Sequence, residues 1–175
     1  NSSRKSTAVS SKGVLNIVHG FGHKVGEALS KHLDVPIISF TGGTATGKKI
    51  ASVAAPMFKK LSLELGGKNP NIIFADAEFD KSVEMAVKAA FSNQGQICLC
   101  GSRLFVQDSI YNNFRAAFIE KTKLLIVGNP KDENSNLGAV VSEQHLDKIL
   151  ECIELAKSEG GKILTGGNRI ILDAE

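Results

Sequence analysis

Short apolar runs alternate along the chain with stretches whose apolar residues recur every three or four positions. The apolar runs lie between turn residues and predict strands at 14–18, 37–40, 61–65, 71–74, 103–107 and 162–165. The periodic stretches predict helices over 27–33, 48–55, 76–92, 109–125 and 142–159. Because strands and helices alternate, the sequence predicts an α/β fold with a doubly wound parallel sheet.

Individual residues refine the predicted helices. Ser109 and Ser142 are predicted N-caps, and the pair at 160–161 is predicted to end the last helix. Cys152, beside Ile153, is predicted to lie in the core. The helix over 76–92 is predicted to pack through an apolar stripe of Val83, Ala86, Val87, Ala90 and Phe91.

The composition of the 175 residues is that of an ordinary soluble globular protein, with 42% hydrophobic and 22% charged residues. No apolar run reaches the roughly 18 residues of a spanning helix, and we expect no membrane partner and a cytoplasmic location. The net charge of +3 is small and the lysines are scattered, so we expect no nucleic-acid partner. The first 12 residues are rich in Ser and are predicted to be a flexible lead.

Cysteine and histidine give no metal site by spacing. The three cysteines, Cys98, Cys100 and Cys152, are an odd number without a zinc-type pattern, which favours a reducing compartment. The four histidines are dispersed along the chain. We therefore expect no bound metal.

Two predicted strand–turn–helix units contain glycine-rich turns, at 20–26 and 41–47. Such a turn can present backbone N–H groups and a helix N-terminus to a phosphate, although the glycines could equally serve only to close tight turns. The second turn also suggests a short-chain dehydrogenase, which needs a Tyr-x-x-x-Lys pair downstream. The single tyrosine, Tyr111, is followed four residues later by Arg115, so that alternative loses its catalytic pair.

Two longer strings carry the most specific signal. The first is Glu-Leu-Gly-Gly-Lys-Asn-Pro at 64–70, and the second is Asn-Gln-Gly-Gln-Ile-Cys at 93–98, followed by Ser102 and Arg103. In this order they resemble the two signature motifs of the aldehyde dehydrogenase superfamily, and the resemblance runs from about Gly13 nearly to the C-terminus. It implies that residues 13–67 end a doubly wound cofactor-binding domain and that 68–175 begin an α/β catalytic domain.

The resemblance also implies roles for single residues. Cys98 would add to a small-molecule aldehyde, hydride would leave to NAD, and a thioester would remain. Glu64 would act as the base that activates water, aided by desolvation, and the backbone N–H of Cys98 would be an oxyanion donor. NADP stays open as an alternative cofactor. The residues expected to bind the cofactor are Phe40, Thr41, Gly42, Gly43, Gly47, Gly22, Gly26 and Leu65, with Gly43 at a position where the family often has Ser.

Other family segments have no counterpart here: the upstream Pro-Trp-Asn motif, the upstream Lys, the downstream Glu-x-Phe-Gly-Pro and the C-terminal oligomerisation segment. The sequence therefore resembles an internal fragment of a longer, homo-oligomeric enzyme, and we expect the fragment by itself to be inactive. The residues at 97–111 resemble the 2-aminomuconic or 2-hydroxymuconic semialdehyde branch. The alternative is a truncated, catalytically silent relative that only binds or packs.

Overall fold

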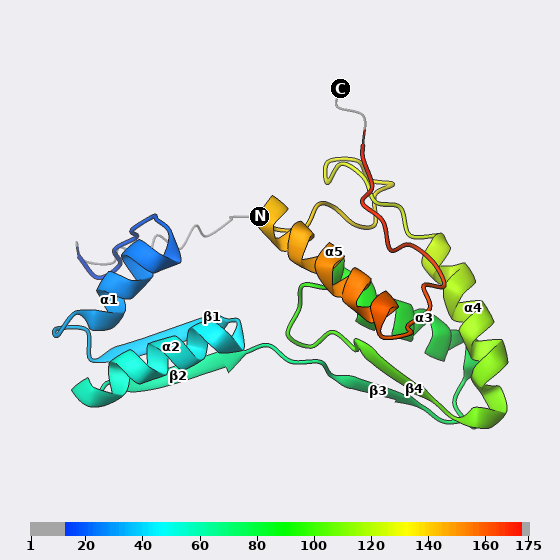
Figure 1. The fold of residues 1–175 in the computed structure, drawn as a ribbon, viewed down its shortest axis with the longest axis horizontal. Helices are drawn as coiled ribbons and strands as arrows, with labels where there is room; N and C mark the ends of the chain where they lie inside the picture. The colour runs from blue at the N-terminus through cyan, green and yellow to red at the C-terminus, as the bar shows by residue number, and fades with distance from the viewer. Residues whose placement is uncertain (1–12, 173–175) are drawn as a thin grey trace, which may run out of the picture. The chain divides into compact units, whose positions relative to one another are not determined.

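Two α/β units make up the chain in the computed structural model, which describes residues 13–172 (Figure 1). The first unit ends at Leu65 and the second begins at Gly66. Each unit contains one pair of parallel strands, so the predicted α/β class with parallel strand pairing is confirmed. The predicted lead at 1–12 lies outside the described residues.

In the first unit, strands β1 (Ile37–Gly42) and β2 (Lys60–Leu65) pair in parallel along their whole length. Helix α2 (Thr44–Ala54) connects them and packs against both strands. Pro56 lies in a 3₁₀ turn, Ala55–Met57, that ends the helix, as expected for a residue without a backbone N–H. This strand–helix–strand crossover places the end of β1 and the start of α2 at one edge of the sheet.

Three predictions for the first unit are wrong. Residues 14–18 form no strand; they are exposed and pair with no described strand, so their apolar side chains gain nothing from extending. The predicted glycine-rich turn is itself helical, because a π-helical turn (Gly22–Gly26) runs directly into α1 (Glu27–Lys31). Helix α2 also begins at Thr44 rather than at residue 48, since Gly43 already acts as its extended N-cap.

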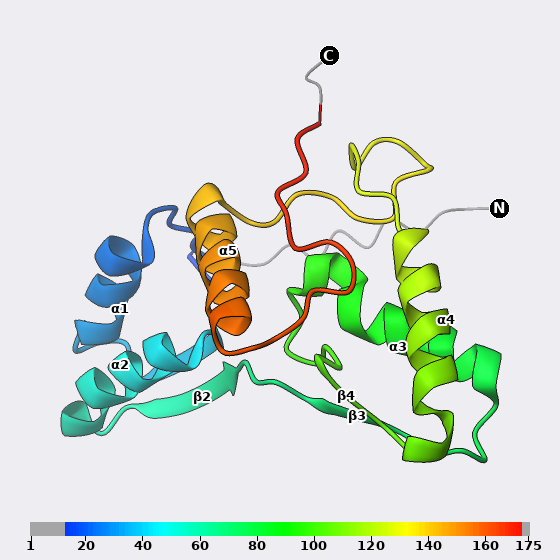
Figure 2. The same cartoon turned by 45° about the vertical axis from the view of Figure 1, so that its right-hand side comes forward.

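In the second unit, strands β3 (Pro70–Ile73) and β4 (Arg103–Val106) are parallel, and α3 (Phe79–Phe91) connects them. Helix α4 (Tyr111–Lys123) follows β4 and packs against α3 (Figure 2). Helix α5 (Glu143–Ser158) comes last. The Cys98 segment is therefore the link between the end of α3 and the start of β4.

The core of the second unit is built around Phe114, which is completely buried. Its ring meets Phe79 edge-on, with centroids 5.9 Å apart. Burying a phenylalanine side chain stabilises a fold by about 1.5–3 kcal/mol, so this cluster anchors α3 and α4 to the sheet. The predicted stripe of α3 is confirmed at its three most buried positions, Val83, Ala86 and Val87.

Four predictions for the second unit are settled by helix ends and burial. Ser142 is the N-cap of α5, as predicted, and its Oγ accepts from the backbone N–H of His145 at 3.2 Å. Ser109 is not an N-cap, because it lies inside a 3₁₀ turn, Asp108–Ile110, that precedes α4. Cys152 is exposed rather than in the core, since α5 buries none of its residues against the described chain. Residues 162–165 are exposed and form no strand, for lack of a described partner.

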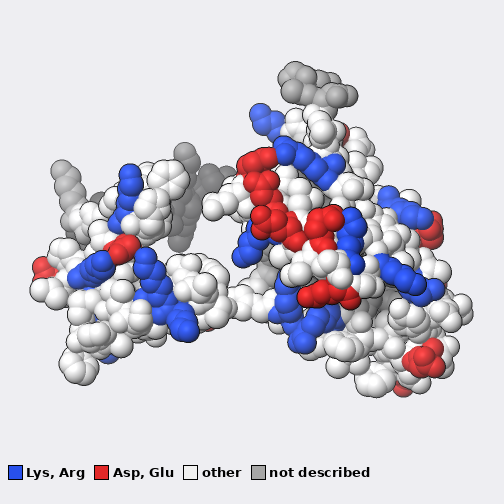
Figure 3. Space-filling model, in the orientation of Figure 1, with Lys and Arg blue, Asp and Glu red and all other residues white. Residues whose placement is uncertain are grey.

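The described residues contain neither a helix long and apolar enough to span a membrane nor a group of three or more potential metal ligands. Figure 3 shows Lys and Arg interspersed with Asp and Glu on the visible face of each unit.

Candidate active site

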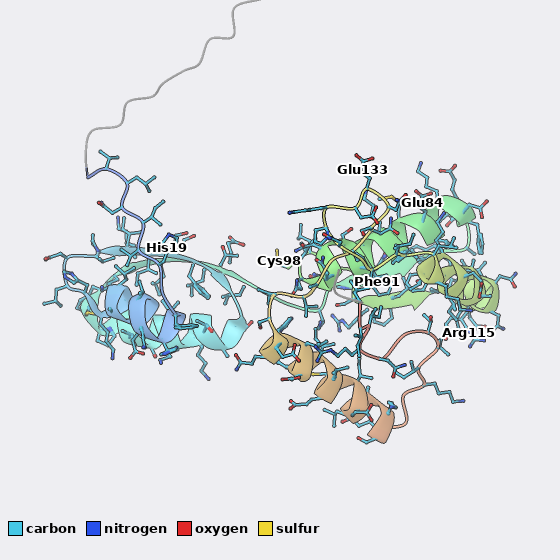
Figure 4. All side chains as sticks on the ribbon, turned by 90° about the horizontal axis from the view of Figure 1, so that it is seen from above. His19, Glu84, Phe91, Cys98, Arg115 and Glu133 are labelled. Carbon is cyan, nitrogen blue, oxygen red and sulfur yellow. The ribbon has the colours of Figure 1, made fainter. Side chains whose placement is uncertain are left out.

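Cys98 lies on an exposed turn between α3 and β4, at the periphery of the second unit (Figure 4). The turn is closed by the backbone N–H of Cys100, which donates to the carbonyl oxygen of Ile97 at 3.1 Å. Cys100 is buried, so only one of the two neighbouring thiols is accessible. The backbone N–H of Cys98 has no acceptor among residues 13–172 and is free to bind an incoming oxygen.

The residues before this turn have an uncommon backbone conformation. Asn93, Gln94 and Gly95 follow one another with φ of 50°, 57° and 73°. A positive φ is uncommon for residues other than glycine and concentrates at functional sites. Gln96 then ties the segment to a distant part of the unit, because its Oε1 accepts from the backbone N–H of Val141 at 3.0 Å. The glutamine-rich string thus fixes the approach of the chain to Cys98.

The two sequence motifs are joined by hydrogen bonds within the second unit. Asn69 donates from Nδ2 to the carbonyl oxygen of Cys98 at 2.5 Å and to that of Cys100 at 3.2 Å. Arg103 donates from Nε to the carbonyl oxygen of Lys68 at 2.9 Å, and from its backbone N–H to that of Asn69 at 3.1 Å. Sequence reasoning singled out the motifs but missed Asn69 as the connecting residue.

Glu64, the predicted base, lies on β2 of the first unit and pairs with Thr41 of β1 in the parallel register. Residues of β2 alternate between half-buried and exposed, and Glu64 falls on the exposed side. Nothing in the first unit covers this carboxylate, so the expected desolvation does not come from the residues of the first unit. Glu64 belongs to the first unit and Cys98 to the second.

Two of the predicted cofactor glycines lie close to neighbouring side chains. A Cβ on Gly42 would lie 2.5 Å from Cζ of Phe40, and a Cβ on Gly47 would lie 2.5 Å from Cδ2 of Leu65. Both distances are far below van der Waals contact, so any side chain there would force Phe40 or Leu65 to move. The structure thereby brings four of the predicted residues together as two contacting pairs.

The start of α2 has the geometry of an anion site. Gly43 is its N-cap with φ −71° and ψ 144°, and no side chain caps the helix there. Backbone N–H groups at a helix N-terminus are partly positive and attract anionic groups such as phosphate. Thr41 is the next-to-last residue of β1, so it lies at the same end of the crossover.

A cavity of about 540 Å³ lies beside these residues in the first unit. Its lining is mostly apolar, and Gly22, Gly26 and Phe40 of the predicted set take part in it. A Cβ on Gly22 or Gly26 would meet no atom within 4 Å, and neither residue has a positive φ. The fold therefore does not need glycine at these two positions, and their missing side chains leave room for an incoming group.

A cluster of charged residues lies beside this cavity. Glu27 forms ion pairs with Lys31 at 2.6 Å and with Lys49 at 3.3 Å. The hydrogen bonds from Lys31 and then Lys49 hold the pKa of Glu27 below its ordinary value. Glu27 and Lys49 both line the cavity, so the pocket combines an apolar interior with charged groups.

Known proteins with related sequences place this geometry in context. Mouse and human 2-aminomuconic semialdehyde dehydrogenases are each 51% identical to the chain over 154 residues, which cover 88% of the chain and 32% of the relative. Betaine aldehyde dehydrogenase from Staphylococcus aureus, solved in complex with NAD+, is 44% identical with a TM-score of 0.85 and matches 88% of the chain and 30% of that protein. A double mutant of the same enzyme was solved with NAD+ and a BME-modified cysteine. The chain spans about a third of the length of these relatives.

The profile of the Aldehyde dehydrogenase family matches residues 6–174, almost the whole chain. The match includes both motifs, the Cys98 turn and the glycine-lined cavity described above. The expected superfamily resemblance is thereby confirmed, and the chain belongs to the aldehyde dehydrogenase family.

Proposed function

We propose that this chain supplies the nucleophile, the base and part of the cofactor site for NAD-dependent oxidation of an aldehyde to a carboxylic acid. The observation that carries the proposal is the Cys98 turn: an exposed thiol next to an unpaired backbone N–H, hydrogen-bonded to the motif that also contains Glu64. A thiol is a strong nucleophile, and an N–H beside it can stabilise the oxygen of a tetrahedral adduct.

Cys98 and Glu64 act in different steps of the proposed reaction. Cys98 loses its thiol proton to water, the thiolate sulfur forms a bond to the aldehyde carbon, and the negative charge on the former carbonyl oxygen is stabilised by the N–H of Cys98. A bound NAD would supply the acceptor for the hydride that leaves the adduct. Glu64 then takes a proton from water, whose oxygen attacks the thioester; the acid is released and the Cys98 sulfur leaves as the thiolate.

The first unit supports the cofactor part of the proposal. The apolar cavity lined by Gly22 and Gly26 suits a planar, largely apolar group such as adenine, and the N-terminus of α2 suits a phosphate. The relative from Staphylococcus aureus was solved with NAD+, which supports NAD as the cofactor here.

The names of the relatives support a substrate class. Both relatives at 51% identity are 2-aminomuconic semialdehyde dehydrogenases, so we propose a semialdehyde as the substrate of the whole protein. Comparing kcat/KM of the full-length enzyme for a muconic semialdehyde and for betaine aldehyde tests this proposal. A preference for betaine aldehyde would refute it.

Competitive alkylation tests the role of Cys98 directly. Cys98 and Cys152 are both exposed, so a difference in their labelling reports reactivity rather than access. With limiting iodoacetamide and peptide mapping by mass spectrometry, we expect Cys98 to be modified first, because Cys98 matches the nucleophile of the family motif whereas Cys152 lies on helix α5. Faster labelling of Cys152 would contradict the assignment.

A further inference from the structure

The side chain of Asn69 reaches the exposed turn that carries Cys98. Its Nδ2 donates to the carbonyl oxygens of both Cys98 and Cys100, at 2.5 Å and 3.2 Å. Within residues 13–172, no other side chain donates to a backbone carbonyl of residues 97–100. The side-chain amide of Asn69 thus bridges two carbonyl groups of the turn, those of Cys98 and Cys100.

Packing holds only one end of this turn, at the buried Cys100. Cys98 is exposed and Leu99 is 80% exposed. A cavity of about 480 Å³, lined in part by Asn69, Leu99 and Gly101, lies beside the turn. The exposed residues of the turn, at 97–99, depend on hydrogen bonds for their conformation, and Asn69 donates two such bonds, to the carbonyl oxygens of Cys98 and Cys100.

Asn69 is itself well anchored. Its backbone carbonyl accepts from the N–H of Arg103 at 3.1 Å, and the preceding carbonyl, of Lys68, accepts from Nε of Arg103 at 2.9 Å. Strand β3 begins at the next residue, Pro70, whose partner in the sheet is Arg103. Because Asn69 is held where β3 pairs with β4, its side-chain amide fixes the turn relative to these two strands.

We propose that Asn69 is a positioning residue, which orients the Cys98–Leu99 peptide and through it the thiol of Cys98. The inference deepens the proposed function and rests on Cys98 as the nucleophile. Asn69 acts through Cys98, so its loss should disturb the turn while leaving the core of the unit intact.

Hydrogen exchange of the 175-residue chain with Asn69→Ala tests this local effect. The backbone N–H groups of Cys100, Gly101 and Ser102 each donate to a carbonyl and report the order of the turn. A hydrogen bond contributes roughly a fivefold factor to a local equilibrium, so we expect these amides to exchange at least about fivefold faster. Amides of α3 should exchange as before, and the labelling of Cys98 relative to Cys152 should fall.

Two further variants separate positioning from a general loss of structure. Asn69→Gln retains the amide donor and should restore much of the protection and of the Cys98 labelling. Asn113→Ala, on an exposed position of α4, serves as the matched control and should change neither. Unchanged exchange of the turn in Asn69→Ala, or a rise that extends equally through α3, would overturn the positioning role. If Cys152 outcompetes Cys98 in the unsubstituted chain, the proposed nucleophile fails, while the exchange data still decide whether Asn69 orders the turn.

Discussion

Replacing Gly26 by Ala should separate the stability of the first unit from its proposed cofactor binding. Gly26 has helical dihedrals, φ −61° and ψ −42°, between the π-helical turn and α1. A Cβ there meets no atom within 4 Å, so alanine fits without strain. Alanine favours a helix over glycine by about 0.5–1 kcal/mol, which predicts a rise in the melting temperature of a few degrees.

The same methyl group should weaken NAD binding, because Gly26 lines the cavity proposed for adenine. Forcing an extra methyl group into a filled site costs about 1–3 kcal/mol, which corresponds to a loss of affinity between about fivefold and a hundredfold. Isothermal titration with NAD and a thermal melt, measured on the same sample, give both quantities.

The matched control is Ser52→Ala, which also favours helix formation, lies on α2 in the same unit and does not line the cavity. It should raise stability and leave the affinity for NAD unchanged. A Gly26→Ala chain that binds NAD as tightly as the unsubstituted chain would refute the cavity as the adenine site. A lower melting temperature would refute the reading that this glycine is not needed by the fold.

The remaining predictions concern catalysis and stability. In the full-length enzyme, Cys98→Ala should abolish both the first-turnover NADH burst and ester hydrolysis. Glu64→Gln should largely spare the burst and slow the steady-state rate, both measured by stopped-flow absorbance. Equal losses of burst and steady-state rate in Glu64→Gln would mean that Glu64 chiefly activates the thiol. Ser142→Ala should destabilise the chain by about 1 kcal/mol through loss of the cap on α5, with α5 amides exchanging faster and α3 amides unaffected. The 175-residue chain by itself should show no measurable oxidation of aldehydes. The family resemblance implies a second oxyanion donor, the Asn of the upstream Pro-Trp-Asn motif, which has no counterpart in this sequence, and losing one such donor costs about a hundredfold to a thousandfold in rate. NADH production that disappears in Cys98→Ala would contradict this prediction.

The strands show what the sequence could predict and what it could not. The runs at 37–40 and 61–65 form strands, and they are parallel partners joined through α2. The runs at 14–18 and 162–165 have a similar apolar composition but find no partner within the described chain, and they stay exposed. An apolar run indicates that a segment tends to be extended. To form a strand it must also pair with a second strand, and the local sequence does not show whether such a partner exists.

For the candidate site, sequence strings pointed to Cys98 and Glu64, but not to the contacts around them. The bond from Asn69 to the Cys98 turn joins residues 29 positions apart and depends on the pairing of β3 with β4. The left-handed backbone at Asn93 and Gln94 was also not predicted from the sequence, although an Asn followed closely by Gly is a recognised signal for that conformation. The exposure of Glu64 follows from the alternation along β2, which the sequence did show, together with the absence of a covering element among the described residues.

The glycines expected to bind the cofactor separate into two kinds once the space around each is known. Gly42 and Gly47 lie beside the ends of the Phe40 and Leu65 side chains, 2.5 Å from a would-be Cβ, so a larger residue there would displace these side-chain ends. Gly22 and Gly26 face open space with ordinary dihedrals, and in Gly26 glycine even weakens the helix that follows. A residue that costs stability without serving the packing of its own unit points to a group from outside the chain. The cavity beside Gly22 and Gly26 is therefore the place where a substitution separates proposed cofactor binding from the packing of the unit.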